Sequence, residues 1–194
     1  MAEVRERANR RLAASRLLTP SALGLALICF LFGFLAVSCG TPGGYGRTGQ
    51  GGETTYTGLD LATGTPPTVD PGHLRPELAG RTDDLGWHPM ILLAAVAIAV
   101  GMVAGAGRFR LRRRVVVTAT AAAIVLLVAG ELVARQRLVD QVADQVRRPL
   151  PPGHAAADYV MVAGGFNGAL VLTGSVLACF VVAYLRRRSA ARTT

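Results

Sequence analysis

The stretch Arg108-Phe109-Arg110-Leu111-Arg112-Arg113-Arg114 lies between two long apolar runs of the chain. It places five arginines within seven residues. A cluster of this kind stays on the cytoplasmic side of a bilayer, because its transfer across the hydrocarbon core is costly. The stretch therefore predicts a cytoplasmic turn. The two flanking runs then form a membrane hairpin, which fixes the orientation of every other segment.

Composition supports an integral membrane protein. Of the 194 residues, 51% are hydrophobic and only 17% are charged. The apolar residues fall in four blocks of about twenty, roughly the length that crosses a hydrocarbon core of about 30 Å. The sequence predicts an all-α fold: a four-helix transmembrane bundle with a small β-containing external loop.

The segments are predicted with the following bounds. The chain begins with a cytoplasmic basic tail (1–19), the first transmembrane helix (20–39), an external loop (40–88), the second helix (89–107) and the cytoplasmic basic turn (108–114). It continues with the third helix (115–134), an external helical extension and turn (135–157), the fourth helix (158–185) and a cytoplasmic tail (186–194). Both termini are then cytoplasmic.

The charge distribution agrees with this orientation. The net charge is +9, and all 21 basic residues are arginine. Fourteen arginines and two acids fall on the predicted cytoplasmic side, against seven arginines and ten acids elsewhere. Each arginine cluster adjoins a span, so we expect contact with the lipid bilayer and its anionic headgroups, at roughly 1 kcal/mol per residue, and no nucleic-acid partner. The arginine-only, Ala- and Gly-rich composition is typical of a GC-rich bacterium, which indicates the bacterial inner membrane.

The end of the first apolar run, Leu35-Ala36-Val37-Ser38-Cys39, admits two interpretations. One is a lipoprotein signal cleaved before a lipidated Cys39, which would leave three spans. Ala36 stands where a larger aliphatic residue is usual, and the run exceeds the 7–15 residues of a signal peptide's apolar region. We therefore favour an uncleaved first helix and keep lipidation as the alternative. The odd number of cysteines, with Cys29 and Cys179 inside spans, indicates no disulfide framework.

The polar segments between the apolar runs also contain sequence patterns that predict local secondary structure. Near-alternation from Glu53 to Gly64 predicts a short strand or hairpin, with Gly58 and Gly64 as turn or bulge positions. Helical spacing continues after the third span and should stop before Pro149. Asp158 or a neighbour is expected to cap the fourth helix.

Two small-xxx-small patterns predict close helix contacts in the membrane. One is Gly101 with Gly105, and the other is Gly164 with Gly168. Asn167, the one amide inside a span, could bond to another helix, and such a bond contributes on the order of 1 kcal/mol. These faces indicate a membrane-protein partner or a second copy of the chain.

Glu131 is the one acid inside an apolar run. An intramembrane carboxylate is a functional candidate. Arg135 follows four residues later on the same helical face, so we interpret Glu131 as a structural residue near the outer interface, where it can reach water or pair with Arg135. The histidines have no partners at ligand spacing, and His88 is interpreted as an interfacial residue. The sequence predicts no catalytic, cofactor-binding or metal-binding residue.

Val37-Ser38-Cys39, followed by Thr57-Gly58-Leu59-Asp60-Leu61-Ala62-Thr63-Gly64, resembles a group of uncharacterised small bacterial four-span membrane proteins. Their external segment follows a Thr-Gly-x-x-Leu-Ala-x-Gly pattern. The resemblance covers about the first third of the chain by motif and implies the same topology. The group has no assigned activity.

Three function classes follow. A non-catalytic scaffold or accessory subunit of a bacterial envelope complex explains the features best. A transporter or channel component would have to use Glu131 or Asn167 as its polar groups. An enzyme is disfavoured, because no nucleophile, base or set of ligands converges.

Overall fold

The computed structural model describes residues 18–38, 53–69, 85–107, 112–145 and 155–190. Contacts divide the chain into two compact units. The described part of the helical unit comprises residues 18–28, 93–107, 112–125 and 168–190. That of the sheet unit comprises residues 29–38, 53–69, 85–92, 126–145 and 155–167. Each unit is described separately below.

Three helices are long and apolar enough to cross a membrane: α3 (Pro89–Ala106), α4 (Arg112–Gln145) and α5 (Gly164–Ala190). At the position of the expected second span, 89–107, the structure has the helix α3, which ends one residue earlier. The third expected span and its helical extension form one continuous helix, α4, of 34 residues. Its length is about 51 Å at 1.5 Å per residue, well beyond a hydrocarbon core of about 30 Å.

The first apolar run does not form the expected helix over 20–39. Its helix is described from residue 18 to residue 28 and is followed by a short 3-10 turn, η1 (Cys29–Leu31). Residues Gly33–Ser38 then form a strand, β1. The apolar helix Leu18–Leu31 is thus shorter than the other three. The four-helix prediction is correct for three long apolar helices and a fourth, shorter one.

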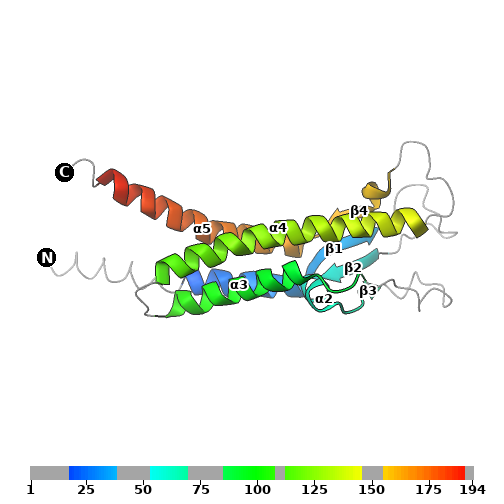
Figure 1. Cartoon of the computed structure of the whole chain (residues 1–194), viewed down its shortest axis with the longest axis horizontal. Helices are drawn as coiled ribbons and strands as arrows, with labels where there is room; N and C mark the ends of the chain where they lie inside the picture. The colour runs from blue at the N-terminus through cyan, green and yellow to red at the C-terminus, as the bar shows by residue number, and fades with distance from the viewer. Residues whose placement is uncertain (1–17, 39–52, 70–84, 108–111, 146–154, 191–194) are drawn as a thin grey trace. The chain divides into compact units, whose positions relative to one another are not determined.

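The strands form one antiparallel sheet in the order β3-β2-β1-β4 (Figure 1). Its other members are β2 (Glu53–Thr57), β3 (Thr68–Val69) and β4 (Val160–Val162). Leu35 of β1 pairs with Tyr56 on one side and with Val162 on the other. Partners on both edges explain why an apolar segment is extended here, because pairing in the fold outweighs local preference.

The fourth helix also begins later than expected. The predicted start at residue 158 falls in a 3-10 turn, η2 (Ala156–Tyr159), which β4 follows directly. Asp158 accepts a bond from the amide of Ala155 and so caps η2 instead of α5. The end of the first apolar run and the start of the fourth therefore both contribute strands to the sheet.

Residues 53–63, in the loop that is predicted to be external, form a strand followed by a helix. The strand predicted after Glu53 is confirmed as β2, but residues Gly58–Thr63 form a helix, α2. Thr57 and Asp60 explain the change, because each side chain accepts a bond from the other residue's backbone amide, at 2.9 and 3.1 Å. This reciprocal capping box starts a helix. Gly64 ends it in the left-handed conformation, with φ of 73°.

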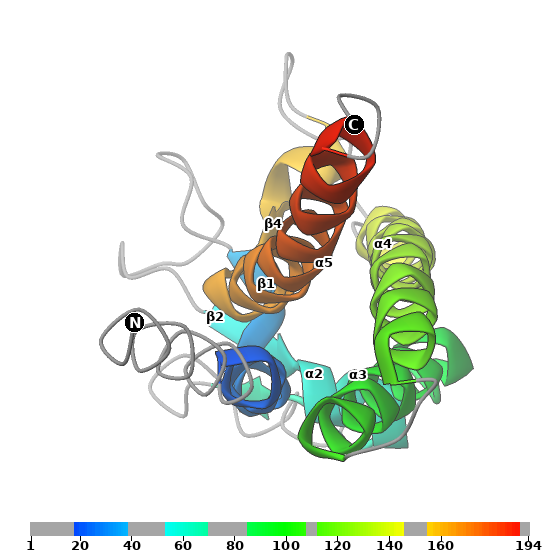
Figure 2. The same ribbon diagram turned by 90° about the vertical axis from the view of Figure 1, so that its left-hand side faces the viewer.

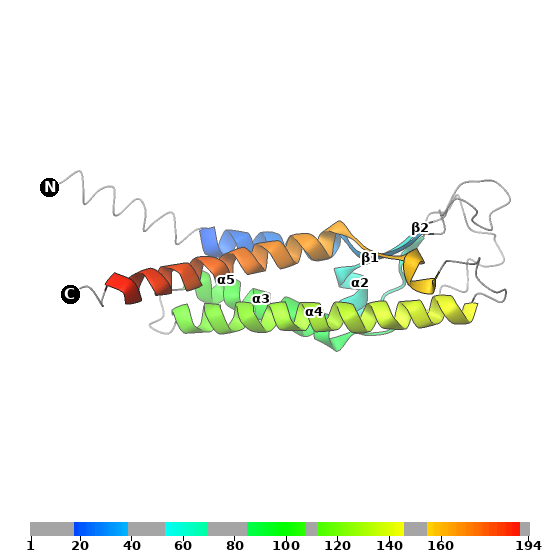
Figure 3. The ribbon, with the colours of Figure 1, turned by 90° about the horizontal axis from the view of Figure 1, so that it is seen from above.

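Three phenylalanines form the core of the sheet unit. Phe34 is fully buried, and its ring lies 4.9 Å from that of Phe30 and 5.8 Å from that of Phe166, between centroids. Figure 3 shows β1 beside β2, the strand that leads into α2. Gly58 is required here, because a Cβ on it would lie 2.7 Å from the Phe34 ring.

Figure 2 shows α3 beside α4, and in this helical unit glycines permit close contacts between the helices. A Cβ on Gly101 of α3 would lie 3.2 Å from Leu23 in the first helix and 3.6 Å from Ala119 of α4. A Cβ on Gly105 would lie 3.4 Å from Thr19. These are the two glycines of the small-xxx-small pattern in α3, and close approach of helix backbones is what such residues permit.

Candidate functional site

Glu131 is the most unusual side chain of the sheet unit. It lies on the buried stripe of α4 with Leu127, Ala134 and Leu138, and only 4% of its surface is exposed. Within the described residues, neither of its buried carboxylate oxygens has a hydrogen-bond partner. The expected bond to Arg135 is absent, and Arg135 itself is exposed. The two residues share a helical face, and the charge of Arg135 acts on Glu131, but Arg135 lies at the exposed edge of this face and donates no hydrogen bond to the carboxylate.

His88, which the sequence predicts to be an interfacial residue, is buried in the interior of the sheet unit. It precedes α3 and is 3% exposed. Its backbone amide donates to the carbonyl of Leu61, at 3.0 Å, and its Nδ1 lies 3.0 Å from the carbonyl oxygen of Gly86. Its buried Nε2 has no hydrogen-bond partner among the described residues.

Burial lowers the pKa of His88, because the charged ring would lose its hydration. The bond to Gly86 opposes this shift, and the positive charge of Arg137 adds to it. The ring is therefore held neutral. The sequence contains no sign of this burial: an exposed Trp87 and a helix-starting Pro89 flank the histidine and suggest a surface.

Glu131 and His88 belong to elements that pack against each other. A Cβ on Gly130, the neighbour of Glu131, would lie 2.8 Å from Ile91 Cγ1 and 3.4 Å from the Ile91 amide nitrogen. That amide donates to the carbonyl of His88, at 3.1 Å. The turn of α4 that carries Glu131 therefore lies against the first turn of α3.

The helix α5 is largely uncovered within the chain. Only 17% of its most apolar window is buried, against 33% for α3 and 39% for α4. Asn167, Val171 and Ser175 are exposed at spacings of four residues, and the described residues place no atom within 4 Å of a Cβ built on Gly174. Gly164, of the expected small-xxx-small pattern, is also open, and Gly168 is half-buried.

The close-contact glycine at this end of α5 is instead Gly165. A Cβ there would lie 2.7 Å from the carbonyl oxygen of Gly33 and 2.8 Å from that of Cys29. The sequence pattern indicated a glycine-rich contact at this point and placed it one residue too early.

At the other end of α5 lie the arginines of the predicted cytoplasmic side. The guanidinium of Arg113 stands 5.6 Å from the centre of the Tyr184 ring, a cation–π contact between α4 and α5. Arg112 and Arg114 lie in the same turn of α4, whereas Arg108 and Arg110 lie outside the described residues.

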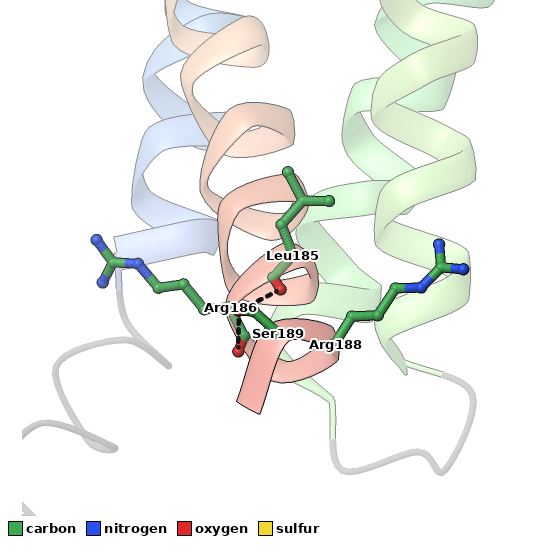
Figure 4. A pocket seen from close by; sticks show the side chains of 4 residues that line it. All are labelled: Leu185, Arg186, Arg188 and Ser189. Atoms are coloured by element: carbon green, nitrogen blue, oxygen red, sulfur yellow. Dashed lines mark hydrogen bonds between the residues drawn. The ribbon is translucent and has the colours of Figure 1, made fainter. Parts of the chain in front are cut away.

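A hollow of about 550 Å³ lies beside this end of α5 and is lined by Leu185, Arg186, Arg188 and Ser189. Figure 4 shows the side chains of Arg186 and Arg188 pointing away from each other. The hydroxyl of Ser189 donates to carbonyls of its own helix. Because its polar groups do not converge, the hollow is a poor match for a specific small ligand.

The described residues offer few candidates for a reactive cysteine or for a metal-binding site. Cys29 and Cys179 are free thiols, and Cys39 lies outside the described residues. In the part of the chain that the structure describes, no group of three or more His, Cys, Asp and Glu residues could hold a metal ion.

Comparison of the chain with protein-family models, with curated proteins and with solved structures finds no match. The fold itself defines the class: a mostly helical chain with three apolar helices of membrane-spanning length, one shorter apolar helix and a small antiparallel sheet.

The neutral, buried His88 makes stability depend on pH. Its pKa is lowered in the folded protein from 6.5, so protonation favours the unfolded chain. The contribution of His88 to stability is complete above that value and is lost as the pH falls below it. In the Glu131→Gln background, where this carboxyl cannot titrate, we expect the thermal unfolding midpoint of the detergent-solubilised protein to fall between pH 8 and pH 5.5, and to fall less when His88→Gln is added. An equal fall in both proteins would contradict the burial of this ring.

Proposed function

We propose that the chain is a non-catalytic integral membrane protein that serves as a scaffold or accessory subunit of a bacterial envelope complex, and that α5 binds its partner. The observation that carries this proposal is the uncovered face of α5, which presents Asn167, Val171, Gly174 and Ser175 at helical spacing. The partner is a transmembrane helix of another membrane protein.

The chemistry of this face suits a helix partner. Lipid tails are as apolar as valine, so burying valine against another helix contributes little by itself. Association in a membrane depends on close backbone approach at small residues and on bonds between polar side chains. Gly174 permits the first. The exposed amide of Asn167 supplies the second, and an amide left in hydrocarbon without a partner is unfavourable.

The arginine distribution supports a cytoplasmic position for both termini, with the first helix as a fourth membrane segment beside α3, α4 and α5. Arg112, Arg113 and Arg114 then lie at the cytoplasmic end of α4, where they meet anionic headgroups. The last part of α4 projects beyond the hydrocarbon on the external side, because the helix is about 20 Å longer than that layer.

The sheet supports the uncleaved chain over a lipoprotein. Cleavage before Cys39 would remove residues 1–38 and, with them, β1, which pairs with both β2 and β4. It would also remove Phe34 from the core of the sheet unit. We therefore propose that the first apolar segment remains in the mature protein and that Cys39 is not its N-terminus.

Substitution of Gly174 by leucine tests the partner helix. Tagged full-length protein is extracted from native membranes in mild detergent, and co-purifying membrane proteins are quantified by mass spectrometry. We expect a recurrent partner with the wild type and at least a tenfold loss with Gly174→Leu, corresponding to about 1.4 kcal/mol. The control is Val103→Leu on α3, another exposed apolar position, which should retain the partner. Equal recovery with both variants would exclude this face of α5.

A second function, as a transporter or channel component, is favoured by the buried, unpartnered carboxylate of Glu131. Intramembrane carboxylates commonly mark ion pathways. Partner loss in Gly174→Leu with unchanged ion flux across reconstituted vesicles supports the accessory function. Flux that depends on Glu131 and not on Gly174 supports transport instead.

A further inference from the structure

Three buried polar atoms of the sheet unit have no hydrogen-bond partner among the described residues: Oε1 and Oε2 of Glu131 and Nε2 of His88. All three are acceptors when the carboxylate is ionised. A carboxylate has no donor. A carbonyl oxygen can only accept, so Nδ1 of His88 donates to Gly86, which leaves Nε2 of the neutral ring with its lone pair.

The described residues of the surrounding elements do not supply the missing donor. The helix α3 contains no charged residue. On α4, Arg135 and Arg137 are both exposed. On α2, the carboxylate of Asp60 accepts the hydroxyls of Thr57 and Thr65, so it is satisfied locally. Among the described residues, Glu131 is therefore the one acid on the buried stripe of α4; the charge of Arg135 acts on it, but no guanidinium donates a hydrogen bond to its carboxylate.

Burying an uncompensated carboxylate costs several kcal/mol, and a positive charge beside it removes most of that cost. One carboxylate and one neutral imidazole require a single positive charge. Divalent metal ions usually take three or more protein ligands, and the described residues offer no such group around Glu131.

We propose that Glu131 and His88 form a buried binding site for a monovalent cation, either a proton or a sodium ion. The site lies where the turn of α4 that carries Gly130 packs against the first turn of α3, directly after His88. Binding of the cation stabilises this packing, because it neutralises a carboxylate that is 4% exposed and has no hydrogen-bond partner among the described residues. The site is separate from the partner-binding face of α5, so its failure and that of the accessory function are distinguishable.

Thermal unfolding of the full-length protein in detergent tests the site. The wild type, Glu131→Gln and Asp140→Asn are compared at pH 8 in sodium chloride and in choline chloride of equal ionic strength, and then in choline chloride from pH 8 to pH 6. Glutamine keeps the size of Glu131 and removes its charge. Asp140 is an exposed acid on the same helix, bonded to Gln136, and serves as the matched control.

A sodium site raises the midpoint of the wild type relative to Glu131→Gln in sodium chloride, by about 2–4 °C for a one-site gain near 1 kcal/mol. A proton site produces the same relative rise as the pH falls and no response to sodium. The titration of His88 occurs in both proteins and has the opposite sign, so it does not mimic this rise. Asp140→Asn should respond as the wild type does.

His88→Gln provides a second test. Removing Nε2 should reduce whichever response the wild type shows, to sodium or to protons. If the difference between wild type and Glu131→Gln stays constant in both series, Glu131 binds neither cation and the proposal is overturned. Retention of the co-purified partner in Glu131→Gln would leave the accessory function intact.

Discussion

Replacement of Gly165 by alanine should destabilise the protein by about 3 kcal/mol, at the upper end of the usual cost of overpacking. The added Cβ would lie 2.7, 2.8 and 2.9 Å from the backbone carbonyl oxygens of Gly33, Cys29 and Phe32. Backbone atoms cannot rotate away as a side chain can. The start of α5 would have to move off the segment that joins the first helix to β1.

The control for Gly165 is the residue next to it. The described residues place nothing within 4 Å of a Cβ on Gly164, so Gly164→Ala should leave stability unchanged or raise it by up to about 1 kcal/mol through helix propensity. The free energy of unfolding is measured by denaturant titration in detergent, followed by circular dichroism. Equal values for the two variants would show that α5 does not approach these carbonyls.

Replacement of Phe34 by alanine should have a comparable or larger effect, about 3–5 kcal/mol. Its ring is fully buried, stacks at a tilt on Phe30 and meets Phe166 edge-on. Truncation removes the ring that joins β1, η1 and the first turn of α5, and it leaves a cavity in the centre of the sheet unit. Gly58 would also lose the surface against which it packs.

Phe32, two residues earlier, is the matched control. It is 60% exposed, so Phe32→Ala should cost less than about 1 kcal/mol. The same titration, with tryptophan emission from Trp87 as an additional probe, compares the two variants. A small effect of Phe34→Ala, close to that of Phe32→Ala, would contradict the core described for this unit.

The sequence alone was sufficient to predict the helices that consist of long apolar runs. An arginine cluster between two apolar runs predicted the ends of α3 and the start of α4 within a few residues. Gly101 and Gly105 were recognisable because their spacing places both on one face of a single helix, and that face does meet the neighbouring helices.

The sheet was not predictable in this way. An apolar strand and an apolar helix have the same composition, and periodicity does not separate them over six residues. What makes Gly33–Ser38 extended is pairing with Val160–Val162, more than a hundred residues away in the chain. The one-residue difference between Gly164 and Gly165 arises from the same cause, because β4 delays the start of α5 and sets its rotation.

The buried polar groups were the least predictable part of the site. Glu131 and Arg135 have the spacing of an ion pair, but only Glu131 lies on the buried stripe of α4. His88 is buried because α2 closes over it through the carbonyl of Leu61, and α2 depends on the capping box of Thr57 and Asp60. Local sequence patterns do not predict the burial of His88, because that burial depends on how α2 forms and where it packs.

The most direct test of the partner-binding helix is photo-cross-linking in intact native membranes. A photoreactive amino acid at Val171, which is 65% exposed on α5, is compared with the same residue at Val100, which is 48% exposed on α3. We predict a discrete protein adduct of defined mass from position 171 and none from position 100. Adducts from neither position, or from position 100 alone, would show that α5 contacts only lipid and would contradict the proposed accessory function.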